Sequence, residues 1–398
     1  LHPVAHSFPT RRSSDLAKNN IKALGVDVKQ EVVDTINEGK IHIVEPALSG
    51  LVSAMVERNM LKAAAKPETA NVFLITVPTP FKGDHEPDIS FVENATRMVI
   101  PCLKQNDLFI IESTSPVGTT EKMAELIYRE RPELAEQIYI AYCPERVMPG
   151  NIIYELEHND RVIGGIDDNS TQRACEFYSR FVHAKLHRTN SRTAEMCKLV
   201  ENSYRDVNIA FANELSVICE KAGINVFELT SLANRHPRVN ILKPGAGVGG
   251  HCIAVDPWFI VNDFQQESKI IRTAREINNY KSLWVVERIN NESLAFEKQH
   301  AQKPVIACMG LAFKPNIDDL RESPALFITR ELMNRNEQIL AVEPNLREYP
   351  EIQLTNYKEA TEKADILAFL VAHNEFKTLD YQKESKIVLD FCGINNRH

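Results

Sequence analysis

The chain has 398 residues, of which 43% are hydrophobic and 25% charged, and it carries a net charge of -8. Its length predicts two or three domains, and its composition is typical of a soluble globular protein. The acidic balance argues against nucleic acid or an anionic membrane as the main partner, although a few local Lys and Arg residues can still bind a phosphorylated ligand. No apolar run approaches the roughly 18 residues that a membrane span requires.

The cysteines are scattered along the chain, and no two of them form a C-x-x-C pair. Their spacing therefore predicts no metal site. No secretory signal is visible, which favours a reducing cytoplasm over a disulfide framework. We expect free thiols at all eight positions: Cys102, Cys143, Cys175, Cys197, Cys219, Cys252, Cys308 and Cys392.

Residues 1–16 show neither helical nor strand periodicity, and they lack the apolar segment of a signal peptide. From Ala17 onward, short apolar strands alternate with helices, which begin near residues 29, 90 and 119. Near-continuous apolar strands that alternate with helices indicate a parallel sheet covered on both faces. The strands are predicted at 21–28, 71–80, 107–116, 139–145, 161–167 and 184–190.

A helical region follows, with helices at 191–223, 225–235 and 267–296, and four more apolar strands begin from Lys303. The predicted fold class is α/β, with two Rossmann-like doubly wound parallel-sheet domains, 17–190 and 301–398, joined by a central helical region, 191–300. One face of the first helix is apolar at helical spacing. Its members are Val200, Tyr204, Val207, Phe211, Leu215 and Ile218.

The strongest local motif is KPGAGVGGHCIAVDPW, residues 243–258. Its glycines let the backbone approach a ligand closely, and their N–H groups can hold an anion. Cys252 follows directly, and its pKa would fall if a helix began there or a cation lay nearby. Cys252 is therefore a candidate nucleophile, with Asp256 four residues further on. The alternative is a flexible surface loop with a structural cysteine.

Lys198, Asn202 and Arg205 are spaced i, i+4 and i+7, which places three hydrogen-bond donors on one helix face. This row could bind phosphate or carboxylate or stabilise an oxyanion, or it could be a solvated face. In the segment FKPNIDDLRESP, residues 313–324, Lys314 and Arg321 could reach phosphates, and the alternative is again a solvated loop.

Polar residues also follow the strands of the first half. Asp27 ends a strand and could bind the ribose hydroxyls of a dinucleotide or cap the next helix, but the G-x-G-x-x-G expected upstream is missing. Thr79, Thr114 and Glu145 each follow a strand at its carboxyl end, where open α/β sheets bind ligands. Each of these residues alone is more often a turn or cap residue.

Together these motifs resemble the UDP-glucose/GDP-mannose dehydrogenase family over residues 17–395. The resemblance implies an enzyme that uses NAD to oxidise the CH2OH group of a UDP-sugar to a carboxylate through a cysteine-bound intermediate. His251 before Cys252 and Val255 before Asp256 resemble the branch that acts on UDP-N-acetyl-D-mannosamine; UDP-N-acetylglucosamine, UDP-N-acetylgalactosamine and UDP-glucose are alternative substrates. The motifs, in family order, are GVD, VPTP, STSPVGTT, CPERVMPG, EMCKLVENSYRDVNIAFANE, RHPRVNILKPGAGVGGHC and FKPNIDDLRESP.

The resemblance also implies the role of each site residue. Cys252 would be the nucleophile, Lys198 and Asn202 would support the oxyanion, and Asp256 and Glu145 would assist proton transfer and water activation. The NAD contacts would be Asp27, Thr79, Thr114 and Arg321, and the substrate contacts Arg146, Val147, Lys198, Asn202, Arg205, His236, Arg238, Gly249, Phe313 and Lys314.

The three predicted segments would accordingly bind NAD, form the dimer and carry catalysis, and bind the UDP-sugar. The expected assembly is a homodimer with the central helices at the interface, and His236 and Arg238 would then act across it. No metal is expected.

The chain departs from the family at its start. The family begins with a strand and a Gly-rich turn reading like IGLGYIG, whereas here the glycine positions relative to Asp27 fall on Val4, His6 and Pro9. Residues 1–16 would thus replace that strand and turn, and the first sheet would lose its central strand. An alternative function follows from this loss: a non-catalytic UDP-sugar-binding protein that binds NAD poorly.

Overall fold

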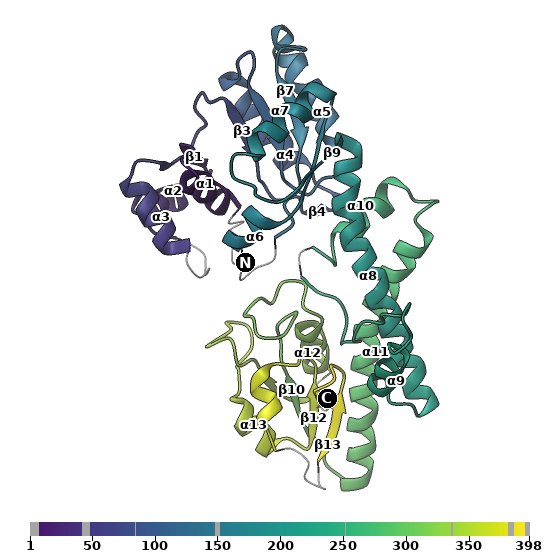
Figure 1. Ribbon diagram of the computed structural model, residues 1–398. Helices are drawn as coiled ribbons and strands as arrows, with labels where there is room; N and C mark the ends of the chain where they lie inside the picture. The colour runs from purple at the N-terminus through teal and green to yellow at the C-terminus, as the bar shows by residue number, and fades with distance from the viewer. Residues whose placement is uncertain are drawn as a thin grey trace. The chain divides into compact units, whose positions relative to one another are not determined.

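The computed structural model describes residues 8–41, 48–83, 85–147, 152–250, 252–335, 337–380 and 386–394 (Figure 1). The motif residues His251 and Met148–Gly150 lie outside these ranges. The chain forms two compact units, Leu1–Val200 and Glu201–His398, and α8 (Ser191–Ala222) contributes residues to both. None of the described helices is long and apolar enough to cross a membrane.

The main sheet of the first unit has five strands in the order β3-β6-β7-β8-β9. The predicted all-parallel arrangement is wrong for one pair, because β8 runs antiparallel to β7, with Ala141 opposite Gly165. Both strands are buried, and an apolar run carries no information about strand direction. The strands are β3 (Val72–Ile75), β6 (Leu108–Ile111), β7 (Tyr139–Tyr142), β8 (Arg161–Gly165) and β9 (Leu186–Asn190).

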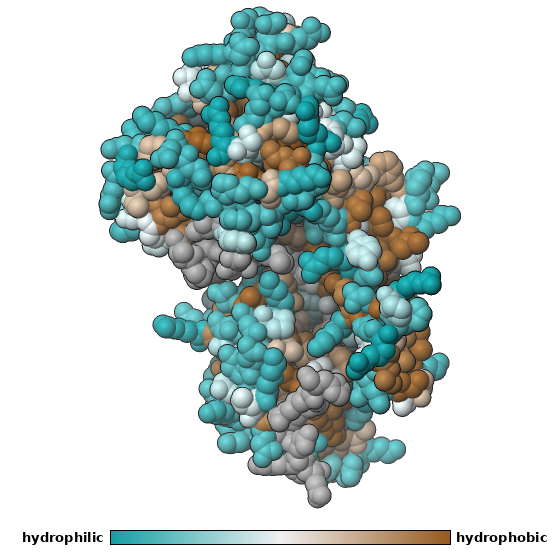
Figure 2. Space-filling view, in the orientation of Figure 1, coloured by the Kyte–Doolittle hydropathy of each residue, from teal (hydrophilic) through white to brown (hydrophobic). Residues whose placement is uncertain are grey.

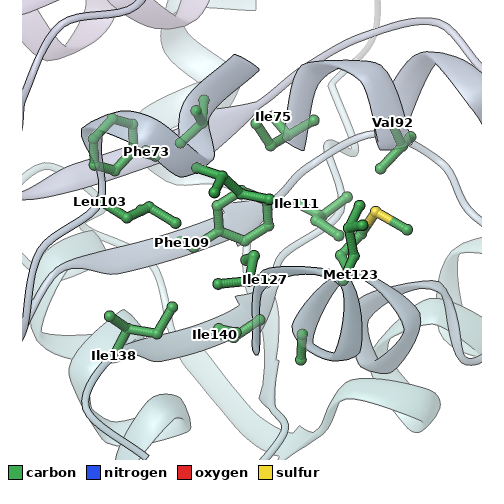
Figure 3. Close-up of a cluster of buried hydrophobic side chains, with 14 of the residues drawn as sticks. Phe73, Ile75, Val92, Leu103, Phe109, Ile111, Met123, Ile127, Ile138 and Ile140 are labelled. Carbon is green, nitrogen blue, oxygen red and sulfur yellow. The ribbon is translucent and has the colours of Figure 1, made fainter. Parts of the chain in front are cut away.

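Helices cover both faces of this sheet. On one face, Val92 of α4 (Ser90–Val99) and Met123 and Ile127 of α5 (Thr119–Glu130) pack around Phe109 and Ile111 of β6 (Figure 3). On the other face lies α7 (Asp168–Tyr178). Short elements complete the unit: β4 (Phe81–Lys82), β5 (Glu86–Pro87), η1 (Ile100–Cys102), η2 (Pro132–Leu134) and α6 (Ile152–His158).

A separate two-stranded parallel sheet precedes the main one. It pairs β1 (Ala23–Val26) with β2 (Leu61–Ala64), and α2 (Gln30–Asn37) and α3 (Leu48–Glu57) pack against it. A doubly wound dinucleotide-binding sheet has the order 3-2-1-4-5-6. Here β2 and β1 correspond to its third and second strands and β3 and β6 to its fourth and fifth, so the sheet is divided where the first strand belongs.

Helix α1 (Phe8–Lys18) lies against both sheets. Leu16 packs with Leu108 and Ile110 of β6, whereas the next residue, Ala17, belongs to the cluster of α2, α3 and β2. A helix uses its backbone groups internally, so it cannot join two strands by hydrogen bonds as a strand would. The expectation that residues 1–16 hold no regular element is therefore wrong from Phe8 onward; Val4 and His6 lie outside the described residues.

The second unit combines helices with a four-stranded parallel sheet in the order β11-β10-β12-β13. The long helix α11 (Lys269–His300) and α12 (Pro324–Asn334) cover one face, and α13 (Tyr357–Lys363) and η3 (Asn374–Thr378) cover the other. The strands are β10 (Val305–Met309), β11 (Gln338–Val342), β12 (Ile366–Phe369) and β13 (Ile387–Asp390), and the remaining helices are α9 (Val226–Ala233) and α10 (Asp256–Asp263).

Two glycines of the first unit should respond oppositely to alanine. A Cβ on Gly164 in β8 would lie 2.1 Å from the carbonyl oxygen of Asn190, whereas a Cβ on Gly50 in α3 would meet nothing within 4 Å. We expect Gly164→Ala to destabilise the protein by roughly 1–3 kcal/mol or more. Gly50→Ala should stabilise it by roughly 0.5–1 kcal/mol. Urea unfolding of both variants measures the two changes, and equal effects would contradict this packing.

Candidate active site

Three loops meet at the carboxyl edge of the main sheet in the first unit. Thr79, Thr114 and Glu145 follow β3, β6 and β7, which are adjacent and parallel, so the prediction of a shared edge is confirmed. The hydroxyl of Ser113 donates to the carbonyl of Val77 at 2.7 Å and joins the first two loops. Thr79 and Thr114 are half-buried, whereas Glu145 is buried. Their binding roles stay predictions.

A buried carboxylate from α8 holds the second loop in place. Glu195 is fully buried and accepts hydrogen bonds from the N–H groups of Gly118 and Thr120, at 2.6 and 2.8 Å, and from the Thr120 hydroxyl at 2.6 Å. These donors lie at the first turn of α5, so Glu195 acts as a cap supplied from another helix. The sequence analysis missed Glu195, although its place three residues before Lys198 puts it on the same helix face.

Glu145 is the centre of a buried ionic network. Its carboxylate accepts from Arg161 at 3.0 Å and from Arg12 at 2.6 Å, and also from the N–H groups of Arg146 and Val147. Burial alone would raise the pKa of Glu145, but the two guanidinium groups outweigh it and hold that pKa below its ordinary value. The carboxylate is thus ionised at neutral pH and weakly basic.

Lys198 lies next to this network rather than on a solvated face. Its ammonium donates to the backbone carbonyl of Glu145 at 2.8 Å. Lys198, the first of the three residues predicted on one helix face, therefore contacts the loop after β7. Because Glu195 and Lys198 are one turn apart, α8 holds two of the three edge loops.

The network extends to residues that the sequence analysis did not single out. Arg12 of α1 also donates to Glu112, the residue after β6, at 3.0 Å, and Tyr178 donates to the same carboxylate at 2.6 Å. Arg12, Glu112 and Arg161 are almost fully buried. Polar residues that are buried in this way need partners, and here the partners come from segments about a hundred residues apart.

Asp27 follows β1, as predicted. One carboxylate oxygen, Oδ1, accepts from the N–H of Lys29 at 2.8 Å, and no described residue donates to Oδ2. The first oxygen thus stabilises the entry into α2, and the second fits a ribose hydroxyl. The role of Asp27 as a ribose contact of NAD stays a prediction. Of the three positions at which the family has its pyrophosphate-binding glycines, Pro9 lies in α1, and Val4 and His6 lie outside the described residues.

In the second unit, two residues of the predicted site, Asn202 and Asp256, form a buried pair. The Asn202 amide donates to the Asp256 carboxylate at 2.5 Å, and both residues are buried. Asp256 begins α10, and its N–H donates to the carbonyl of Cys252 at 2.8 Å. Cys252 is half-buried. Asp256 thus links the backbone of Cys252 to the amide of Asn202 through two hydrogen bonds. By contrast, burial raises the pKa of Cys143 and Cys308 to about 12, which leaves those thiols unreactive.

The glycines before Cys252 allow close packing against protein. A Cβ on Gly249 would lie 2.4 Å from the carbonyl oxygen of Glu322, and one on Gly250, at φ 85°, would lie 2.9 Å from the Phe313 ring. The N–H of Gly250 donates to the carbonyl of Arg321. The glycine turn and the 313–324 loop were predicted as separate motifs, but they pack against each other. The glycines were expected to let the backbone approach a ligand, and in this structure they let it approach the 313–324 loop.

A buried pair anchors the 313–324 loop. Glu343, after β11, accepts from the N–H groups of Leu311 and Ala312 at 2.8 and 2.9 Å and contacts His373 Nε2 at 3.1 Å. His373 Nδ1 accepts from the N–H of Asn316 at 3.0 Å, which assigns the proton to Nε2. Both side chains are fully buried. The sequence analysis missed both residues.

The remaining predicted contacts lie at the surface. Lys314 is exposed, and Arg321 forms a two-pronged pair with Asp319. Arg205, His236 and Arg238 are exposed as well. The loop that carries His236 and Arg238 is closed at its base, where Asn234 exchanges two hydrogen bonds with Ile241, at 2.7 and 2.9 Å. Among the described residues, no cluster of His, Cys, Asp and Glu could hold a metal ion.

Comparisons with known proteins agree on one family. The UDP-glucose/GDP-mannose dehydrogenase family is matched by its NAD binding domain at residues 11–182, its central domain at 192–280 and its UDP binding domain at 307–397. The chain is 52% identical to the UDP-N-acetyl-D-mannosamine dehydrogenase of Escherichia coli K12, over 98% of this chain and 96% of that protein. It is 48% identical to an NDP-N-acetyl-D-galactosaminuronic acid dehydrogenase of Ralstonia nicotianae, over 95% and 92%.

Solved structures give the same result. The UDP-N-acetyl-mannosamine dehydrogenase of Pyrococcus horikoshii superposes with a TM-score of 0.88 at 35% identity, over 98% of this chain and 94% of that one. The enzyme of Staphylococcus aureus gives 0.85 at 37% identity, over 97% and 96%. Fold, site and comparisons define an NAD-dependent oxidoreductase. The chain belongs to the UDP-glucose/GDP-mannose dehydrogenase family.

Arg161→Met should destabilise the protein by about 3–5 kcal/mol, because it leaves the buried Glu145 carboxylate with one guanidinium fewer. The lowered pKa of Glu145 means that its stabilisation is present above the unfolded-state pKa of about 4.3 and is lost as the pH falls through the folded-state pKa. The difference from wild type should therefore be largest at neutral pH and shrink in acid. Urea unfolding measures it, with Arg188→Met, on the exposed side of β9, as the control; equal losses would contradict the network.

Proposed function

We propose that the chain catalyses the NAD-dependent four-electron oxidation of UDP-N-acetyl-D-mannosamine to UDP-N-acetyl-D-mannosaminuronate. The relatives at 52% identity that carry this name support the substrate. The observation that carries the reaction is Cys252, a half-buried cysteine four residues before α10. Its backbone carbonyl accepts from the N–H of Asp256, whose carboxylate accepts from Asn202. We place the reaction in the cytoplasm and in polysaccharide biosynthesis.

The proposed mechanism captures the aldehyde covalently. When bound, NAD would supply the hydride acceptor, one molecule for each of the two oxidations. The CH2OH carbon first loses a hydride and its hydroxyl a proton, which gives an aldehyde. The thiolate of Cys252 adds to the aldehyde carbon, and the thiohemiacetal then loses a second hydride and a proton to become a thioester. Water attacks the thioester carbonyl, the C–S bond breaks, and the carboxylate and the free thiolate result.

The other site residues serve the charges that develop during these steps. Lys198 and Asn202 donate hydrogen bonds to the oxyanion that forms when the thiolate adds to the aldehyde and when water adds to the thioester. Donors placed at such a developing charge lower the barrier. Asp256 and Glu145 assist proton transfer and water activation. Arg161 and Arg12 lower the pKa of Glu145 and make it a weak base. To accept a proton in the reaction, Glu145 needs weaker interactions with these two guanidinium groups.

A second candidate function follows from α1. Because a helix stands between β1 and β3 where the pyrophosphate turn belongs, the chain could bind a UDP-sugar without turnover. The relative from Ralstonia favours N-acetyl-D-galactosamine as another sugar, and UDP-N-acetylglucosamine and UDP-glucose complete the range to be tested.

One assay separates these functions. Purified protein with NAD should yield two NADH per UDP-N-acetyl-D-mannosamine, and the responding sugar in a panel of UDP-sugars identifies the substrate. Cys252→Ser should stop net oxidation after the first hydride, whereas Cys102→Ser, at another half-buried cysteine, should match wild type. A wild-type NADH yield from Cys252→Ser would refute the nucleophile. Absence of NADH with intact UDP binding would support the second function.

We also propose a homodimer through the central helices. Tyr204, Phe211 and Ile218 of α8 are spaced by seven residues and are 69%, 55% and 56% exposed, and Leu232 of α9 is 63% exposed. Figure 2 shows brown residues gathered over this helical region. An exposed apolar stripe at heptad spacing is suited to a second helix. The closed loop carrying His236 and Arg238 would then reach the partner's substrate.

Mixed dimers test this arrangement. If Arg238 acts across the interface, mixing inactive Cys252→Ser with inactive Arg238→Ala should restore activity, because one site of each mixed dimer then has both residues. Random mixing makes about half of the dimers mixed, and one of the two sites in each mixed dimer is complete. Roughly a quarter of wild-type activity is therefore expected. If Arg238 acts within its own chain, every site lacks one residue and no activity returns. Activity measured before and after mixing decides the question.

A further inference from the structure

The second unit contains a cavity with a volume of about 180 Å³, and Cys252 is not one of its lining residues. It lies between α8, α9, α11 and the end of β13. The proposed mechanism uses none of its lining residues. Its walls combine aromatic rings with polar side chains. The rings are those of Phe227, Trp284 and Phe391, and the polar side chains include Ser216, Lys281 and Arg288.

The amine of Lys281 is deeply buried in this cavity. It is 3% exposed, its ammonium donates to the hydroxyl of Ser216 at 2.8 Å, and it lies 3.8 Å from the centre of the Trp284 ring. Among the described residues it forms no ion pair with a carboxylate. The Ser216 hydroxyl in turn donates to the carbonyl of Asn213 at 2.6 Å. An ammonium group has three donors, so two of those of Lys281 remain for a ligand.

The acids that line the cavity are already engaged. Glu220, from α8, accepts from Arg288 of α11 at 2.6 Å. Asp390, at the end of β13, accepts from the N–H groups of Cys392, Gly393 and Ile394. Arg288 also pairs with Glu292. Within the described part of the chain, Lys281 is therefore the charged lining group that no carboxylate neutralises: the Ser216 hydroxyl and the Trp284 ring are its partners, and a buried ammonium without a counter-ion is costly.

We propose that this cavity binds a small organic carboxylate with an apolar body. Its carboxylate would take the two remaining donors of Lys281, and its body would pack against Trp284, Phe227 and Phe391. The volume suits a single ring, because a cavity of about 150 Å³ accommodates benzene. A carboxylate at this place would offset the charge that the fold leaves unpaired.

Binding should be linked to protonation. Burial lowers the pKa of Lys281 to about 7, with Glu220 opposing the shift, and Arg288 and Asp390 are the other charged groups facing the cavity. A bound carboxylate favours the ammonium form and raises this pKa. Affinity should therefore fall as the pH rises from about 6 to about 8, and at the upper end binding should take up a proton.

Calorimetry on the full chain, with UDP present to occupy the substrate site, tests the proposal with benzoate as the probe. Benzoate should bind at least about tenfold more tightly than its neutral analogue benzamide. Heats measured in buffers of different ionisation enthalpy should show the proton uptake. Equal binding of benzoate and benzamide, or no binding of benzoate, would overturn the proposal.

Two variants locate the site. Lys281→Met should abolish benzoate binding and stay folded, because replacing an unpaired buried amine by an apolar chain of similar length relieves its desolvation; thermal unfolding checks the fold. Lys298→Met, at an exposed lysine of the same helix, should bind benzoate as wild type does. Unchanged binding in a folded Lys281→Met variant would show that the carboxylate sits elsewhere.

Discussion

Buried carboxylates that bind backbone N–H groups hold the loops of this protein in place. Glu195 caps the first turn of α5, Glu145 binds the two N–H groups that follow it, and Glu343 binds the segment before Phe313. A carboxylate buried without partners would be costly, and the N–H donors offset part or all of that cost. Together with their other partners they hold the pKa of Glu145 and of Glu343 below its ordinary value, whereas at Glu195 burial outweighs them and raises the pKa. Each loop is thereby fixed where a strand ends, and the side chains it presents are fixed with it.

The same principle explains why the glycines precede Cys252. With the 313–324 loop anchored by Glu343 and His373, the turn at 247–250 must fit against a rigid surface, and a side chain at Gly249 would overlap the Glu322 carbonyl. Glycine is needed there because another backbone passes close by. The position of Cys252 thus depends on residues far along the chain from it.

The sequence could predict what local periodicity encodes. Apolar runs located the strands of the two larger sheets, although the predictions at 71–80 and 107–116 ran about five residues past the ends of β3 and β6, and β2 was not predicted. Spacing placed Lys198 and Asn202 on one face of a long helix. Partners distant in sequence could not be predicted this way: nothing near Glu195 indicates that it would bind Gly118, and nothing near His373 indicates Glu343. The direction of β8 was missed because a strand buried on both faces reads the same either way.

Helix α1 shows why a polar sequence can still be a core element. Three polar residues of this helix are buried: Arg12, Ser14 and Asp15. An argument from hydrophobic periodicity would place such residues at the surface. Arg12 can be buried because its guanidinium binds the carboxylates of Glu112 and Glu145. This placement has a consequence for the divided sheet. A helix can fill the volume of a missing strand and pair its charges, but it leaves the facing edges of β1 and β3 without the ladder that a central strand supplies. Within the described residues, β1 and β3 are therefore connected through the side chains of α1 instead of through backbone hydrogen bonds to a central strand.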